Sequence, residues 1–323
     1  MQVKASAPGK AILFGEHAVV YGKPAIAMAI SKRACVDVLD CSSANNINVN
    51  IRDLGIKGCI DFDSGAIMSD SPRKGILKYI LESIEKVHDG SGIDINIDVN
   101  MPIGGGLGSS AAVTVATIAA VSAYNKIDLK EEEIAKYAHE VELTVQKSFA
   151  SPLDTTISTY GGLIYLEANA EDIVQLDIEY DIPVVIGYTD TRGDTGKLVE
   201  AVRIRRDIYP EIINPVIDSI ELITEEAKEA ILKNDKKRIG ELMNINHGLL
   251  DALGVNTKEL SSMVYTARNA GACGSKITGA GGGGSIIAYC PDGTSNIISA
   301  IGKTEKALKA DISKEGVKIT TLH

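Results

Sequence analysis

Hydrophobic and polar residues alternate along 93–99, and this period of two predicts a strand with one buried face. The same alternation at 35–39 and 47–51 predicts two more strands. Residues 2–7 also have the pattern of a short strand, which Pro8–Gly9–Lys10 is expected to break before an apolar run at 11–14. Apolar runs predict further strands at 25–30, 161–166, 182–188, 286–289 and 317–321. The first third is therefore predicted to be β-rich, with a mixed or antiparallel sheet.

A stripe of apolar residues spaced three and four apart predicts an amphipathic helix over 73–88. The Ser- and Pro-containing stretch 148–156 predicts a loop. Further helices are predicted at 109–124, 130–146, 195–207, 211–233, 236–253, 257–270 and 296–308. This order indicates an α+β protein with two domains, 1–180 and 181–323, and a cleft between them.

The composition narrows the class of protein. The chain has 323 residues, 45% hydrophobic and 24% charged, which is typical of a globular protein. A formal net charge of −10 argues against nucleic-acid binding, and the absence of Trp argues against base-stacking surfaces. Five cysteines without CxxC spacing indicate reduced thiols. With no signal-peptide stretch and an apolar segment at 111–123 too short to span a bilayer, we expect a cytoplasmic protein with no membrane partner.

The densest cluster of glycines lies between a predicted strand and a predicted helix. Four glycines occupy five positions in the segment Pro102–Ala112, sequence PIGGGLGSSAA. Without Cβ atoms, backbone N–H groups can approach an anion closely, and a helix N-terminus adds unpaired donors. Ser109 and Ser110 could cap the helix or ligate a phosphate-bound Mg²⁺. A flexible loop before a capped helix is the alternative, and the spacing matches neither a Walker loop nor a dinucleotide-binding fingerprint.

Other segments add groups of the same chemistry. A second glycine-rich loop covers 279–284, while Lys10 and Asp154 lie in predicted loops. Glu142 lies near the C-terminal end of its helix, the unfavourable end for an acid, so we expect it to have a partner such as a cation. A phosphate cradle, a metal site, a cation and a carboxylate together are what phosphoryl transfer needs.

Three ordered motifs resemble those of the GHMP family of small-molecule kinases. They are Pro8–Gly9–Lys10 running into Gly15–Glu16–His17, then Pro102–Ala112, then Lys276–Gly284, sequence KITGAGGGG. The resemblance implies an N-terminal ATP-binding domain similar to ribosomal protein S5, a ferredoxin-like C-terminal domain and an active site in the cleft. The segment Gly15–Ala27, sequence GEHAVVYGKPAIA, further resembles the family branch that phosphorylates mevalonate. Another hydroxy-acid or sugar acceptor, and a non-enzymatic nucleotide sensor, are the alternatives.

The resemblance also implies roles for single residues. Asp154 would be the catalytic carboxylate, and Lys10 would stabilise the developing alkoxide. Mg²⁺ would be held by Ser110 and Glu142, and Glu16, His17 and Thr195 would shape the acceptor pocket. We add Arg192 as a partner for a substrate carboxylate. A homodimer is a further family expectation. The ATP phosphates would be bound by Pro102, Gly104, Gly105, Gly106, Leu107, Gly108, Ser109, Ser110 and Ala111.

Overall fold

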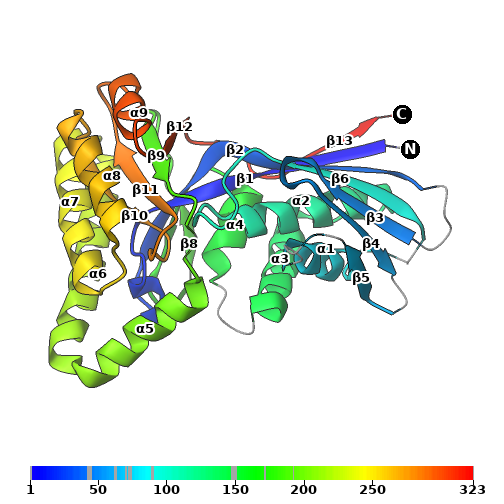
Figure 1. Cartoon of the computed structure of the whole chain (residues 1–323), viewed down its shortest axis with the longest axis horizontal. Coiled ribbons are helices and arrows are strands. Elements are labelled where there is room, and N and C mark those ends of the chain that lie inside the picture. Colours follow the sequence, from blue (N-terminus) through cyan, green and yellow to red (C-terminus); the bar gives the residue numbers. More distant parts are fainter. Residues whose placement is uncertain are drawn as a thin grey trace.

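A computed structural model of the chain describes residues 2–41, 46–61, 64–69, 71, 75–88, 91–146, 151–170, 172–191 and 193–322. Within these residues two β-sheets lie one after the other along the long axis of the molecule (Figure 1). The predicted α+β organisation is confirmed, because each sheet carries helices packed against it.

The larger sheet is built mainly by the first half of the chain. Its described strands follow the order β13-β1-β2-β6-β3-β4-β5, with β7 and β8 attached beside β2. All of the pairs are antiparallel except β3 with β6, so the sheet is mixed, as predicted. The strands are β1 (Gln2–Phe14), β2 (Ala25–Asp40), β3 (Asn46–Ile51), β4 (Ile56–Asp61), β5 (Ala66–Ser69), β6 (Ile93–Val99), β7 (Leu163–Leu166), β8 (Ile173–Gln175) and β13 (Lys318–Leu322).

Four helices cover one face of this sheet (Figure 1). The alternation in β6 places Ile93, Ile95 and Ile97 in the core beneath them. The central helix α2 contacts β1, β2 and the other three helices, which explains why its sequence is apolar all round instead of striped. The four are α1 (Gly75–Glu85), α2 (Ser109–Tyr124), α3 (Glu131–Gln146) and α4 (Pro152–Tyr160).

The smaller sheet is antiparallel, with the strand order β10-β11-β9-β12. Helices α7, α8 and α9 contact it, α6 packs against α7 and also contacts β1 and β2, and α5 packs against α6. Its elements are β9 (Val184–Tyr188), α5 (Thr195–Ile208), α6 (Pro210–Leu232), α7 (Lys236–Ala252), α8 (Lys258–Asn269), β10 (Gly274–Thr278), β11 (Ser285–Tyr289), α9 (Ser295–Ile301) and β12 (Lys306–Ala310).

After β12 the chain leaves the smaller sheet. Its last strand, β13, pairs with β1 of the larger sheet, which brings the two ends of the chain together (Figure 1). The smaller sheet contains only residues after 181, and the larger contains only residues before it apart from β13. The division of the chain into domains 1–180 and 181–323 stays a prediction.

Two predicted strand breaks are wrong. β1 continues through Pro8–Gly9–Lys10, with only a register shift between Pro8 and Gly9. β13 pairs with β1 no further than Ser6, so a proline just beyond it breaks no ladder bond on that side. On the same side beyond the end of β13, the N–H of Lys10 donates to the carbonyl of Leu107 at 2.9 Å. β2 likewise runs unbroken where two strands were predicted.

Two element types were also predicted wrongly. The predicted loop at 148–156 contains the start of α4, because Ser151 caps the helix and Pro152 occupies its first turn; residues 147–150 lie outside the described part. The predicted helix at 296–308 ends at Ile301, followed by Gly302, and its second half forms β12.

Candidate active site

The first glycine loop needs glycine both for backbone shape and for space. Gly104, Gly106 and Gly108 have φ values of +77°, +78° and +66°, a region that favours glycine. A Cβ at Gly108 would lie 2.6 Å from Cγ of Lys10. The loop therefore lets α2 begin directly against the Lys10 side chain.

The second glycine loop, 279–284, packs against the first. A Cβ at Gly279 would lie 3.1 Å from Cα of Gly106, and one at Gly284 would lie 3.3 Å from the carbonyl oxygen of Gly105. This loop also contributes to the wall of the cleft described below. The loop therefore packs its backbone against the first loop and also lines the cleft.

Lys10 and Asp154 form an ion pair, with Nζ 3.1 Å from Oδ1. The Lys10 side chain is 5% exposed and the Asp154 side chain 29% exposed, so the lysine is enclosed while the carboxylate meets the cleft. Asp154 lies in the first turn of α4, where the positive end of the helix dipole favours a carboxylate. The Ser151 hydroxyl, which accepts from the N–H of Leu153, fixes where that turn begins.

Ser110 and Glu142 form a second pair beside the first. The Ser110 hydroxyl donates to Oε1 of Glu142 at 3.0 Å, and Glu142 is buried. Burial, and then the negative charge of Asp154, raise the pKa of Glu142 to about 8, while Ser110 and Lys10 act in the opposite direction. The partner expected for Glu142 is therefore a hydroxyl, with the Lys10 ammonium close enough to influence its charge.

Glu16 and His17 lie in the turn between β1 and the short helix at Ala18–Tyr21. Glu16 is buried and forms an ion pair with Lys276 on β10. His17 has a φ of +61°, and its Nε2 donates to the carbonyl of Ala280 at 2.9 Å. Burial lowers the pKa of His17, so the ring is neutral near pH 7.

A cleft of about 360 Å³ collects most of the predicted site residues. Thr195, the first residue of α5, also lines the cleft. Leu107 and Ala111 are buried in the core, and they and Pro102 do not line the cleft. Arg192 lies outside the described residues. The predicted residues that line the cleft are Lys10, Glu16, His17, Gly104, Gly105, Gly106, Gly108, Ser109, Ser110, Glu142, Asp154 and Thr195.

Sequence reasoning missed two residues of this region. Tyr79 on α1 lines the cleft close to Ser110 and Glu142, whose negative charge helps to raise the pKa of the Tyr79 phenol, although burial is the larger cause. Lys276 is fully buried behind Glu16. Tyr79 belongs to an ordinary amphipathic helix pattern, and Lys276 to a motif that is recognised by its glycines. The sequence around them therefore did not mark either residue as functional.

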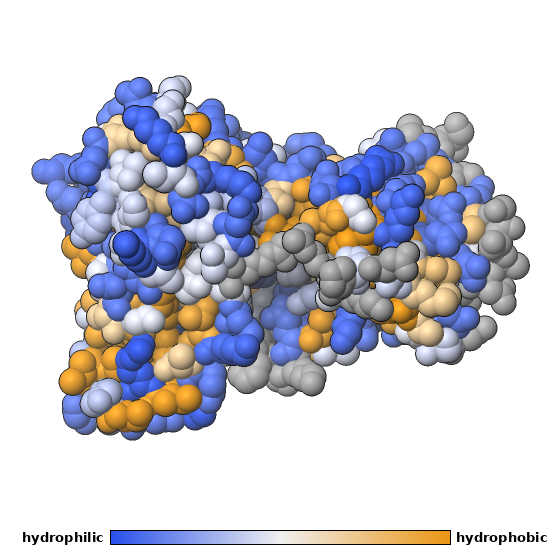
Figure 2. Space-filling view, in the orientation of Figure 1, coloured by the Kyte–Doolittle hydropathy of each residue, from blue (hydrophilic) through white to orange (hydrophobic). Residues whose placement is uncertain are grey.

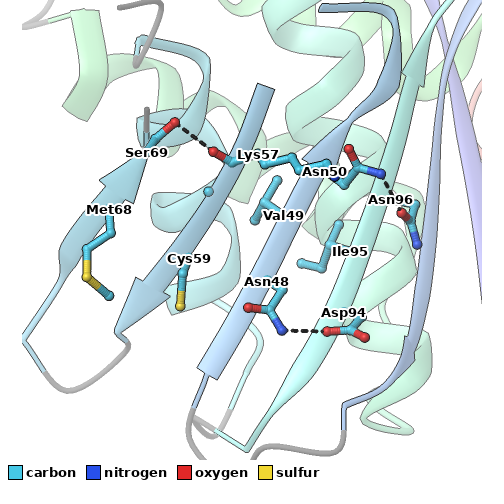
Figure 3. Close-up of a pocket in the computed structure, with 11 residues that line it drawn as sticks. Asn48, Val49, Asn50, Lys57, Cys59, Met68, Ser69, Asp94, Ile95 and Asn96 are labelled. Atoms are coloured by element: carbon cyan, nitrogen blue, oxygen red, sulfur yellow. Dashed lines mark hydrogen bonds between the residues drawn. The ribbon is translucent and has the colours of Figure 1, made fainter. Parts of the chain in front are cut away.

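A second hollow, of about 570 Å³, lies on the outer face of β3, β4, β5 and β6 (Figure 3). Its polar side chains bond mainly to one another: Asn48 to Asp94 at 2.8 Å and Asn50 to Asn96 at 3.2 Å. None of the predicted site residues that the structure describes lies there. This is the pattern of a solvated sheet face, so the candidate active site is the cleft at the glycine loops.

Comparison with known proteins identifies the family of the chain. The model of the GHMP kinase N-terminal domain matches residues 74–162, and that of the GHMP kinase C-terminal domain matches 227–307. A mevalonate kinase of Methanothermobacter thermautotrophicus is 48% identical over 317 residues, covering 98% of this chain and all of the relative. The chain belongs to the GHMP kinase family. A mevalonate kinase of Pyrococcus furiosus is a second relative, 44% identical over 99% of this chain and 98% of its own length.

Solved structures confirm the two-domain GHMP kinase fold. The Methanococcus jannaschii mevalonate kinase superimposes with a TM-score of 0.82 at 29% identity, covering 97% of this chain and 98% of the other. The L. major mevalonate kinase in complex with R-mevalonate gives 0.79 at 27% identity, covering 96% and 95%. In the described part of the chain, no helix is both long and apolar enough to cross a membrane.

Proposed function

We propose that this GHMP kinase is an ATP-dependent mevalonate kinase, acting in the cytoplasm as its scattered cysteines predict. The observation that carries the proposal is the close approach of two pairs, Lys10 with Asp154 and Ser110 with Glu142, beneath the first glycine loop. The choice of mevalonate rests on full-length relatives with that name at 43–48% identity.

The reaction follows from the positions of the groups. The N–H groups of 104–108 and of the first turn of α2 bind the ATP phosphates, aided by the helix dipole. The primary hydroxyl of the acceptor lies against the Lys10–Asp154 pair, within reach of both groups. Its oxygen forms a bond to the γ-phosphorus as the bond from that phosphorus to the β–γ bridging oxygen breaks. Asp154 takes the hydroxyl proton, and the Lys10 ammonium stabilises the negative charge that develops on the oxygen.

Ser110 and Glu142 fit a magnesium site. One hydroxyl and one carboxylate suffice, because Mg²⁺ fills its remaining positions with water and phosphate oxygens. Glu142 is buried with the Asp154 carboxylate near it, and both raise its pKa, so a bound cation would stabilise the ionised form of the Glu142 carboxylate. When bound, the ion would neutralise charge on the transferring phosphate.

The acceptor side of the cleft carries Glu16, His17 and Thr195. We propose that His17 and Thr195 hydrogen-bond the hydroxyl and carboxylate oxygens of mevalonate. The proposed pairing of Arg192 with the substrate carboxylate concerns a residue outside the described part of the chain.

An acceptor panel tests the proposal. With ATP and Mg²⁺, a coupled assay is expected to show ADP release with mevalonate and little with galactose, homoserine or phosphomevalonate. Preference for another member of the panel would assign the cleft to that hydroxy-acid or sugar. No ADP release with any acceptor would contradict a kinase function and favour a nucleotide sensor.

We also propose a homodimer formed through the outer surface of α5 and the start of α6. Ile204, Ile208, Tyr209 and Ile212 gather there, each about half exposed or more, and the same region is visibly apolar at the lower left of Figure 2. Such patches mark association surfaces. Light scattering is expected to give twice the monomer mass for the wild type and the monomer mass for Ile208→Glu combined with Ile212→Glu.

The matched control for this prediction is Ile173→Glu. Ile173 is comparably exposed but lies on β8, away from the patch. The control is expected to remain a dimer, because it adds the same charge outside the interface. A monomeric wild type, or a double variant that stays dimeric, would contradict the assignment.

A further inference from the structure

A fully buried lysine on the smaller sheet has no role in the reaction described above. Lys276, on β10, has no exposed surface, and its ammonium forms an ion pair with Oε1 of Glu16. It also donates to the carbonyl of Ile277 at 2.7 Å and reaches that of Ile12 at 3.5 Å. The ammonium therefore joins β10 to the end of β1 and the turn that follows.

Enclosing two charges in this way is costly, so the pair is not explained by stability alone. Burial raises the pKa of Glu16 and lowers that of Lys276, and replacing a buried ion pair by neutral groups is often tolerated. A pair of neutral side chains could fill the same space. The ion pair provides something that they would not, which is a fixed direction for the carboxylate.

Among the groups around the Glu16 carboxylate, Lys276 acts most strongly, ahead of the backbone N–H of Glu16 itself. The second carboxylate oxygen, Oε2, lies 3.4 Å from the amide nitrogen of Asn246 on α7, a long contact. The Lys10 ammonium acts on Glu16 only from a distance, after the Lys276 contacts. His247, also on α7, is neutral because burial lowers its pKa to about 4.

Glu16 in turn reaches the cleft, and so does its neighbour His17. His17 holds a positive φ and donates to Ala280, four residues after Lys276. Between these two links, Thr278 accepts from the N–H of Ile12 and donates to its carbonyl, both at 3.0 Å. The segment 276–280 thus contacts the end of β1 through Thr278 and the Glu16–His17 turn through Lys276 and Ala280.

We propose that Lys276 is a positioning residue for the acceptor, which holds the Glu16 carboxylate, and with it the His17 turn, in the orientation that the acceptor contacts. The inference rests on the proposed kinase function of the cleft. It assigns Lys276 no contact with substrate, and it places the effect of its loss on the acceptor side instead of the nucleotide side.

The test compares Lys276→Met, Glu16→Gln and the double variant with the wild type. Each is expected to raise the KM for mevalonate about tenfold or more, with the KM for ATP within about twofold of the wild type. Because Lys276 acts through Glu16, the double variant is expected to be no worse than the poorer single variant instead of multiplying the two effects.

Ser275→Ala is the matched control, on the same strand. Its buried hydroxyl donates to the carbonyl of Val264 at 2.9 Å, on the side of β10 that faces α8, and it does not line the cleft. This variant is expected to lower the melting temperature while both KM values stay at the wild-type level. This control therefore distinguishes a general loss of stability in β10 from a change in the position of the Glu16 carboxylate.

A wild-type KM for mevalonate in folded Lys276→Met, or multiplied effects in the double variant, would overturn the inference. If Lys276→Met does not fold, the test uses Glu16→Gln and the double variant, which has no unpaired charge at this place. Both are expected to show the same raised KM for mevalonate. Wild-type KM values in both would overturn the inference. A wild-type enzyme that prefers another acceptor would refute the choice of mevalonate, and the same variants would then be compared with that acceptor.

Discussion

Asp154→Asn is expected to lower kcat for mevalonate phosphorylation about 10²–10⁴-fold. The amide keeps the shape of the side chain but cannot take the hydroxyl proton, and it removes the anion that pairs with Lys10 at 3.1 Å. Nucleotide affinity should change by less than about threefold, because the phosphate site that we propose is made by the N–H groups of the first glycine loop and not by Asp154. Steady-state kinetics and a fluorescent nucleotide titration measure the two quantities.

Asp190→Asn is the control for this substitution. Asp190 pairs with Lys306 in an exposed position and does not line the cleft, so the same chemical change should leave kcat unaltered. An Asp154→Asn enzyme that turns over at the wild-type rate would refute the proposed role of the carboxylate, and a loss of ATP binding would place Asp154 in the nucleotide site instead.

Glu142→Gln is expected to raise the Mg²⁺ concentration for half-maximal rate about tenfold or more, equivalent to about 1.4 kcal/mol of binding free energy. The glutamine can still accept from Ser110, but it supplies no negative charge for the ion. In the wild type, Glu142 with a pKa of about 8 is mostly protonated at pH 7 and ionised at higher pH. Because the ion competes with that proton, the half-saturating Mg²⁺ concentration should fall between about pH 7 and pH 9.

Glu140→Gln, on the same helix, provides the comparison. Glu140 pairs with Lys86 on the surface, outside the cleft, and its loss should leave the Mg²⁺ dependence as it is in the wild type. The pH effect should also vanish in Glu142→Gln, which has no proton to release. An unchanged Mg²⁺ requirement in Glu142→Gln would remove this residue from the metal site.

The parts of the fold that could be predicted are those whose pattern is local. The alternation of β6 gave its bounds, and the apolar run of α2 gave both of its ends. The sequence 148–156 misled because Ser and Pro favour loops and helix starts alike, and only packing of Leu153 and Ile157 against the sheet decides between them. The strand β12 was read as helix because its partner β9 lies more than a hundred residues earlier.

The residues of the candidate site also fall into those that the sequence could predict and those that it could not. Lys10, Asp154, Ser110 and Glu142 could be named because three motifs resembled those of one family, and the structure brings these four residues together. Lys276 was part of a motif yet received no role, since the sequence of β10 does not reveal that its side chain meets Glu16, 260 residues away. Contacts between the two halves of the chain are what the sequence alone could not supply.

The central claim is that the primary hydroxyl of mevalonate receives the phosphoryl group at the Lys10–Asp154 pair. Phosphorus and proton NMR of the purified product tests this most directly, because mevalonate carries a primary hydroxyl, a tertiary hydroxyl and a carboxylate. We predict a phosphate monoester coupled to the protons of the terminal CH₂ group. A phosphate on the tertiary hydroxyl or on the carboxylate, or release of inorganic phosphate alone, would contradict the account.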